Sequence, residues 1–343
     1  MVDIGNSARA IRSSTSGGGW IMVDLKSVLG AGLVGVTLLT GNMAVAQSYP
    51  SKPVRIIVNQ PAAGGTDATG RVIAQGLQEI LGKPFIVENV VGASGAIGID
   101  VVKRAEADGH TLLFTASIAV TNQAANPKAA YDITTDLAPI TLVGEAPYIM
   151  AIKPQIPANN ARELAAYAHT RELNWGISQF GGGDHFASAQ FVNASGAKAL
   201  IVPFKGAGQA ITALISGDID VLISPPSVII PQVSAGKVKA VGVTGSKRMD
   251  VLPNVMTVAE AGFPGYDQTT WFGMWGPRGM SPALVNSIQQ AVVSALKQPR
   301  TVDFFNRAAT IPVGSKPDDF AALIAKTLTS YRAVAKAANI TVE

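Results

Sequence analysis

Residues 54–81 read VRIIVNQPAAGGTDATGRVIAQGLQEIL, and this stretch decides the fold. Its β-branched opening, Val54–Val58, is typical of a buried strand. The Pro- and Gly-containing segment 61–67 breaks that strand. Apolar residues then recur at helical spacing from Ala68 to Leu81, and Gly82 ends the helix. The stretch therefore predicts a strand, a glycine-rich turn and a helix, which together are the repeating unit of an α/β fold.

The same unit recurs along the chain. Further strands are expected at 85–88, 111–115, 148–152, 174–177, 199–204, 221–224 and 240–244. Further helices are expected at 99–105, 161–169, 185–195 and 209–215. Two comparable α/β sets in one chain predict a pair of lobes, each with a central mixed or parallel sheet, and a hinged cleft between them.

Composition excludes several classes of function. The chain has 343 residues, a formal net charge of +4, no cysteine and three histidines. Without cysteine it has no catalytic thiol, no disulfide and no cysteine-ligated zinc. Charged residues make up 15% and form no basic block, so no nucleic-acid partner is expected. We also expect no metal site and no cofactor.

The N-terminal residues have the features of a secretory signal peptide. Lys26 precedes an apolar run at 28–40, and Ala44-Val45-Ala46 matches a small-residue cleavage site. We expect residues 1–46 to be a leader and signal peptide that is cleaved after Ala46; the alternative is a buried core helix. Export with no later membrane span predicts a periplasmic or cell-surface protein.

Two glycine-rich turns, at 61–67 and 178–185, each lie between an expected strand and an expected helix. Glycine lets the backbone approach a ligand closely, and the free N–H groups of a helix start favour an anion. The alternatives are plain helix capping for the first turn and a flexible connection for the second. One such turn in each lobe could converge on a carboxylate across the cleft.

Other motifs allow other functions. Ser178 and His185 could serve a secreted serine hydrolase, but Gly176–Phe180 lacks the final glycine of the G-x-S-x-G turn. The segment 204–209 has only part of a dinucleotide fingerprint, so we interpret it as a cleft-edge loop. The aromatic stretch 269–277 is either core or the floor of a ligand pocket.

Taken together, several segments carry a family resemblance. They are YPSKPVRIIV at 49–58, PAAGGTD at 61–67, VEN at 87–89, GASGAIG at 92–98, ADGHTLL at 107–113, VPFKGAG at 202–208, GDIDV at 217–221, AGKVKA at 235–240, residues 252–265 and WFG at 271–273. In this order the chain resembles the Bug receptors, which are periplasmic solute-binding proteins of tripartite tricarboxylate transporters. The resemblance implies a monomeric two-lobed flytrap that is not an enzyme and passes a small organic carboxylate to its membrane transporter.

The resemblance also implies lobe boundaries and a ligand site. Lobe 1 would be 47–146 plus 269–343, and lobe 2 would be 147–268. The ligand-binding residues would be Pro61, Ala62, Ala63, Gly64, Gly65, Thr66 and Asp67 in the first turn, Ser117 and Asn122 in a loop after the third strand, and Ser178, Phe180, Gly181, Gly182, Gly183 and Asp184 in the second turn. The edge formed by Phe204, Lys205 and Gly206 would lie nearby, with Trp271 as the pocket floor.

The chain departs from the family pattern in the second turn. Gly182 stands where relatives often carry a serine, and Asp184 would repel a second carboxylate if it faced the cleft. Phe180, Phe204 and Trp271 would suit an aromatic or amide-bearing acid. A receptor that presents its ligand to a membrane sensor kinase would share this site and differ only in its partner.

Overall fold

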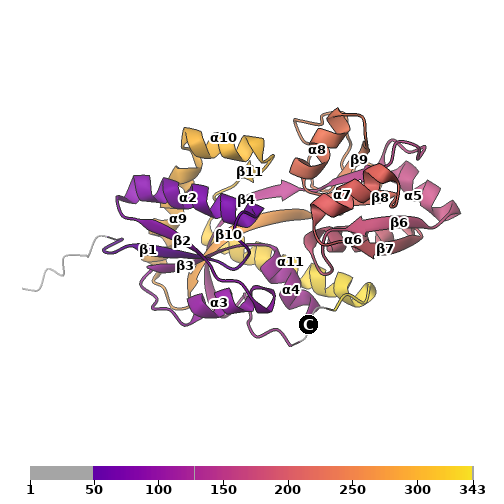
Figure 1. The fold of residues 1–343 in the computed structure, drawn as a ribbon. Helices are drawn as coiled ribbons and strands as arrows, with labels where there is room; N and C mark the ends of the chain where they lie inside the picture. The colour runs from indigo at the N-terminus through magenta and orange to yellow at the C-terminus, as the bar shows by residue number, and fades with distance from the viewer. Residues whose placement is uncertain (1–48, 127, 342–343) are drawn as a thin grey trace, which may run out of the picture. The chain divides into compact units, whose positions relative to one another are not determined.

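Two mixed β-sheets organise the described residues, 49–126 and 128–341, in this computed structural model (Figure 1). The first sheet has the strand order β11-β4-β10-β3-β1-β2, and the second has the order β7-β6-β8-β5-β9. In the first sheet the strands are β1 (Val54–Val58), β2 (Phe85–Asn89), β3 (Thr111–Ala116), β4 (Leu137–Pro147), β10 (Thr269–Pro277) and β11 (Ile311–Pro312). In the second they are β5 (Ile149–Ile152), β6 (Leu173–Ile177), β7 (Ala199–Pro203), β8 (Val221–Ser224) and β9 (Lys239–Val243).

Helices connect the strands of both sheets. Those that follow strands of the first sheet are α2 (Gly65–Leu81), the short 3₁₀ helix η1 (Ala93–Gly95), α3 (Ala96–Lys103), α4 (Ile118–Ala125), α9 (Pro282–Leu296), α10 (Pro299–Arg307) and α11 (Pro317–Ala337). Those that follow strands of the second sheet are α5 (Ala161–Thr170), α6 (Gly183–Ser195), α7 (Ala207–Ser216) and α8 (Pro226–Ser234). The alternation confirms the α/β class predicted from the sequence.

The two sheets share one plan. In the first sheet β1 pairs with β2 and β3 in parallel, and β10 then pairs antiparallel with β3 and β4. In the second, β6 pairs with β7 and β8 in parallel, and β5 then pairs antiparallel with β8 and β9. Each sheet is therefore a parallel set extended by antiparallel strands, which makes both sheets mixed.

Strand alternation divides the core of the first sheet between its two faces. Val54, Ile56 and Val58 of β1 belong to a cluster with residues of α2 and α9, whereas Ile57 belongs to a cluster with residues of α3, α4 and α11. Because both faces are covered, β1 reads as a continuous apolar run rather than an alternating one. This arrangement fixes the C-terminal end of β1, from which the first glycine-rich turn leaves.

The two predicted ligand helices begin earlier than the sequence pattern indicated. The expected ranges were 68–81 and 185–195, but α2 starts at Gly65 and α6 starts at Gly183. Glycine is a poor helix former, so propensity alone placed both starts after the glycines. The glycines themselves form the first turns, with Gly64 and Gly182 as N-caps in extended backbone.

The loop expected after the third strand is also helical. Ser117 is the N-cap of α4, and Asn122 lies within that helix. The strand β4 and the C-terminal helices α9, α10 and α11 were not predicted from the sequence. The strand β4 is long and buried, and its Pro and Gly residues hid the pattern.

Hydrogen bonds of the Thr244 side chain join the chain where it passes between the sheets. It leaves the first sheet through Tyr148, between β4 and β5, and returns between β9 and β10. The buried Thr244 accepts a hydrogen bond from the Tyr148 amide at 2.7 Å and donates its hydroxyl to the Gln268 carbonyl at 2.5 Å. One side chain therefore ties together both crossing segments.

The signal-peptide prediction concerns residues 1–46, which lie outside the described residues. Among the residues that are described, none of the helices combines the length and apolar character needed to cross a membrane.

Packing between α2 and α9 generates a test of the fold. A Cβ atom on Gly76 would lie 2.8 Å from the Ala295 Cβ and 2.7 Å from Gln298 Oε1. We expect Gly76→Ala to lower the free energy of unfolding by about 1–3 kcal/mol through overpacking, measured by urea denaturation at constant m. The matched control is Gly208→Ala, because a Cβ on Gly208 meets nothing within 4 Å. Equal stability of the two variants would contradict this packing.

Candidate functional site

The first glycine-rich turn is held in place by Asp67, the third residue of α2. Its carboxylate accepts hydrogen bonds from the Ala63 amide at 2.9 Å, the Arg71 guanidinium at 2.9–3.0 Å and the Asn89 side chain at 2.9 Å. Ala63 has a φ of +65°, in the left-handed region, so its amide points back towards this carboxylate. The first helical amide bond runs from Ala68 to the Gly64 carbonyl, which leaves the preceding amides outside the helical ladder.

Asp67 is a structural anion. Its hydrogen bond from Arg71, with those from Ala63 and Asn89, outweighs desolvation and lowers the pKa of the Asp67 carboxyl from 3.8 to about 2. Only 4% of the residue is exposed. The carboxylate therefore stays ionised and holds the turn in place through these hydrogen bonds.

The second turn repeats this plan with a different acceptor. Gly181 has a φ of +73°, and its amide donates to Nδ1 of His185, the third residue of α6, at 3.1 Å. Burial lowers the pKa of the His185 imidazole to about 4, so the ring is neutral and can accept this hydrogen bond at pH 7. His185 thus corresponds to Asp67, and both residues lock the turn that precedes their helix.

The second turn also carries a buried acid, Asp184, next to His185. Its carboxylate accepts a hydrogen bond from the Ser178 amide. Burial, which leaves 4% of the residue exposed, raises the pKa of the Asp184 carboxyl in spite of the hydrogen bonding around it. His185 Nδ1 accepts the Gly181 amide, and within the described residues no hydrogen bond joins the Ser178 hydroxyl to the His185 ring, so the two are not paired as nucleophile and base.

Both turns line one pocket of about 360 Å³. Seven residues predicted from the sequence line it: Gly65, Thr66, Ser117, Ser178, Gly182, Gly183 and Asp184. These residues come from the starts of α2, α4 and α6 and from the end of β6. The turns, far apart in the sequence, therefore meet at one concave site.

The other predicted residues lie around this pocket without lining it. Pro61, Ala62, Ala63, Gly64 and Asp67 build the first turn, and Gly181 builds the second. Phe180 is 47% exposed, with its ring centroid 4.6 Å from that of His185. Phe204, Lys205 and Gly206 form the next loop, where the Gly206 amide donates to the Ser178 carbonyl and the following Ala207 reaches the pocket.

Two further predicted ligand residues, Asn122 and Trp271, are buried and do not line the pocket. The Asn122 side chain donates to the Ser94 carbonyl at 2.7 Å. Trp271 is 2% exposed and packs against Trp275 and Phe320. It also borders a separate hollow of about 150 Å³. Because neighbouring strand residues face opposite sides, Thr270 and Phe272 line the 360 Å³ pocket instead.

Sequence reasoning missed the rest of the pocket wall. Its other lining residues are Gln60, Thr69, Ala116, Ile118, Ala146, Tyr148, Gln179, Ala207, Pro225, Pro226, Ser227, Thr270, Phe272, Phe304, Ala308 and Thr310. One sequence signal could have identified Gln60, because this residue lies between β1 and the glycine-rich turn. The Thr66 hydroxyl donates to Gln60 Oε1 at 2.6 Å, which leaves the buried Gln60 Nε2 without a partner at the pocket.

The pocket has no cationic side chain. No lysine, arginine or histidine is among the lining residues in the described part of the chain. Tyr148 lies against Gly183 so closely that a Cβ there would overlap its hydroxyl. An anion in this pocket would therefore be held by hydroxyls, amides and helix starts rather than by a positive side chain. Within the described residues, no cluster of three or more metal-ligating side chains is present.

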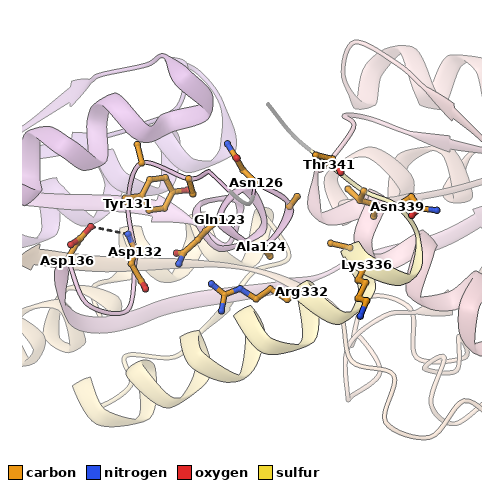
Figure 2. Close-up of a pocket in the computed structure, with 15 residues that line it drawn as sticks. Gln123, Ala124, Asn126, Tyr131, Asp132, Asp136, Arg332, Lys336, Asn339 and Thr341 are labelled. Carbon is orange, nitrogen blue, oxygen red and sulfur yellow. Dashed lines mark hydrogen bonds between the residues drawn. The ribbon is translucent and has the colours of Figure 1, made fainter.

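A larger hollow of about 740 Å³ lies elsewhere, between α4, the segment after it and the end of α11 (Figure 2). Its wall carries Asp132 and Asp136 opposite Arg332 and Lys336, so the charges balance. None of the predicted ligand residues lines it. The 360 Å³ pocket is therefore the better candidate for the site.

Comparisons with known proteins identify the class. Residues 69–340 match the family model described as the tripartite tricarboxylate transporter family receptor. Protein BugT of Bordetella pertussis is 29% identical over 89% of this chain and 95% of its own length. The chain therefore belongs to this receptor family, as the sequence resemblance predicted.

Solved structures of the same class carry ligands. The R. palustris protein Rpa4515, solved with adipate, is 28% identical over 85% of this chain and 99% of its own, with a TM-score of 0.72. MatC from Rhodopseudomonas palustris, with bound malate, is 29% identical over 83% and 99%, with a TM-score of 0.69. Members of this class are binding proteins, and these two were solved with small carboxylates.

The Asp67 interactions predict a pH-dependent stability. The pKa of this carboxyl is lower in the folded state, so its contribution is complete above about pH 3.8 and is lost as the pH falls through about 2. We expect Asp67→Asn to lower the free energy of unfolding by about 1–2 kcal/mol at pH 7 and by less at pH 3.

Urea titrations at the two pH values measure this difference. Asp303→Asn is the matched control, because Asp303 also pairs with an arginine four residues away but has a side chain that is 64% exposed. That variant should lose less than about 0.5 kcal/mol. An equal loss for Asp67→Asn at both pH values would contradict the role assigned to its charge.

Proposed function

We propose that this protein is a periplasmic solute-binding receptor that captures a small organic carboxylate and delivers it to a tripartite membrane transporter. One observation supports this most directly: two glycine-rich helix starts, 118 residues apart in the N-caps Gly64 and Gly182, line or flank a single pocket. Helix starts offer free amides and a positive dipole end to an anion.

The pocket has the size and lining of a small-molecule site. Its volume of about 360 Å³ lies within the range of such sites, about 300–1,000 Å³. The first turn offers the amides of Gly65 and Thr66, and Gln60 Nε2 and the Ser117 hydroxyl add side-chain donors. We assign the carboxylate to this wall, which Gln60 and residues at the starts of α2 and α4 form.

The proposed ligand capture involves a motion of the two lobes predicted from the sequence. Lobe 1 would be 47–146 plus 269–343, and lobe 2 would be 147–268. The two sheets lie one in each range, and the crossing segments at Tyr148 and at Thr244–Gln268 would act as the hinge. A ligand that contacts both walls would favour the closed state over the open one. We propose no catalytic step, because Ser178 and His185 are not hydrogen-bonded to each other among the described residues and His185 Nδ1 accepts the Gly181 amide instead.

Export is part of the same proposal. Relatives with solved structures include the periplasmic binding protein BugD. The signal peptide expected at 1–46 would deliver this chain to the same compartment. Mass spectrometry of the protein secreted to the periplasm should find a mature N-terminus at Gln47.

Substitution at Gly65 tests the site without disturbing the fold. A Cβ on this glycine meets no atom within 4 Å, so a larger side chain would extend into open pocket space. Against a panel of mono-, di- and aromatic carboxylates, calorimetry should give at least one ligand for the parent protein. We expect Gly65→Val to weaken its affinity at least tenfold.

The control is Gly208→Val, because Gly208 lies in the first turn of α7, has the same open Cβ position and does not line the pocket. It should bind like the parent. Unchanged affinity in Gly65→Val would refute the site, and a parent that binds no carboxylate would refute the ligand class.

A further inference from the structure

Tyr148 connects the pocket with the first crossing segment. It lies between β4 and β5, and only 6% of the residue is exposed. Its amide donates to the Thr244 hydroxyl at 2.7 Å, and its carbonyl accepts from the Thr244 amide at 3.0 Å. Thr244 belongs to the other crossing segment and does not line the pocket. The backbone of Tyr148 is therefore engaged away from the pocket, with the second connection between the sheets.

The hydroxyl of Tyr148 lies at the far end of its side chain, beside the start of α6. A Cβ atom on Gly183, the first residue of that helix, would overlap this hydroxyl. Gly183 and Tyr148 both line the 360 Å³ pocket. Because the backbone is held by Thr244 while the hydroxyl lies against a pocket residue, the hydroxyl is the part of Tyr148 that reaches the pocket.

This hydroxyl is free to donate to a ligand. Among the described residues, no carbonyl or carboxylate accepts a hydrogen bond from it, whereas the equally buried Tyr131 and Tyr266 donate to the carbonyls of Ala119 and Ala187 at 2.6 and 2.8 Å. A buried tyrosine hydroxyl usually has a hydrogen-bond partner. Burial also raises the pKa of the Tyr148 hydroxyl, so it keeps its proton at pH 7.

Two more hydroxyls lie at the same end of the pocket. Thr270 of β10 lies near the Tyr148 hydroxyl, and its Oγ1 is 3.4 Å from Ser117 Oγ. Ser117 is 2% exposed, and although it is the N-cap of α4 its side chain makes no capping hydrogen bond. A contact of 3.4 Å is weak for two hydroxyls. In the part of the chain that the structure describes, none of the three protons is therefore committed to a carbonyl or carboxylate in this pocket.

Resting on the proposed function, we infer that Ser117, Thr270 and Tyr148 form the end of the ligand site next to the crossing segments, and that the Tyr148 hydroxyl donates to an acceptor oxygen of the bound carboxylate. Ser117 and Thr270 belong to elements of the first sheet, whereas Tyr148 packs in the core of the second. An oxygen-bearing group bound among them contacts both sheets. Tyr148 is thus the contact through which the ligand engages the proposed hinge.

Removal of the Tyr148 hydroxyl alone tests the inference. The probes are lactate, pyruvate, succinate, malate, adipate and benzoate, measured by calorimetry at pH 7. For a probe that the parent binds, Tyr148→Phe should weaken the affinity at least about tenfold, because the ring stays and only the donor is lost. Its urea midpoint should equal that of the parent, since no buried carbonyl or carboxylate of the described residues loses a partner. Thr270→Val, which keeps the side-chain volume, should weaken the same probe at least about threefold.

Tyr266→Phe is the matched control. Tyr266 lies in the second crossing segment, is 3% exposed and does not line the pocket, and its hydroxyl is bonded to the Ala187 carbonyl. This variant should lower the urea midpoint and bind like the parent.

The outcomes separate the inference from the proposed function. Parent affinity in Tyr148→Phe, or in Thr270→Val should the first variant not fold, would overturn the inference and leave the receptor function standing. A loss of affinity that comes with the fall in urea midpoint expected of Tyr266→Phe would give the hydroxyl a structural role and would overturn the inference as well. Failure of all six probes to bind the parent would overturn both the inference and the proposed function.

Discussion

The site depends on a backbone geometry that occurs twice. In each case a residue with positive φ turns its amide towards the third residue of the following helix, and that side chain accepts the hydrogen bond. Asp67 and neutral His185 have little chemical similarity, yet both hold a glycine N-cap at the same place relative to its helix. Because the side chains of Asp67 and His185 do not line the pocket, the amides in the first turn of each helix are free to face it. The pocket therefore needs no cationic side chain to receive an anion.

The sequence predicts the outline of this arrangement well and its details less well. The run Val54–Val58 and the glycine-rich turn after it specify the strand, the turn and the helix, because strand and helix periodicities are strong over these lengths. Signals of this kind in the two glycine-rich turns place six of the predicted residues at the pocket, and the family resemblance adds Ser117. They do not distinguish residues that touch the pocket from residues that support it. Asp67 and Gly181 belong to the second kind, because a hydrogen bond to a neighbouring turn leaves no mark in the pattern.

The remaining part of the pocket wall could not be predicted for a physical reason. Thr270 and Phe272 face the site, whereas Trp271 faces the core, and only the register of β10 against β4 and β3 decides between the two faces. Phe304, Ala308 and Thr310 reach the pocket from the C-terminal part of the chain, through tertiary packing. Long-range placement of this kind depends on contacts between elements, which local propensity does not contain.

Thr244 has a consequence for how the molecule can move. Its single hydroxyl is hydrogen-bonded to both segments that connect the sheets, accepting from one and donating to the other, in a position with no exposure to solvent. The two connections cannot shift separately without breaking a buried hydrogen bond, which is costly. Elsewhere, Phe186 of α6 and Tyr331 of α11 pack with ring centroids 4.8 Å apart, so α11 contacts a helix that follows the second sheet. In the closure proposed for the two lobes, both connections would therefore have to move together.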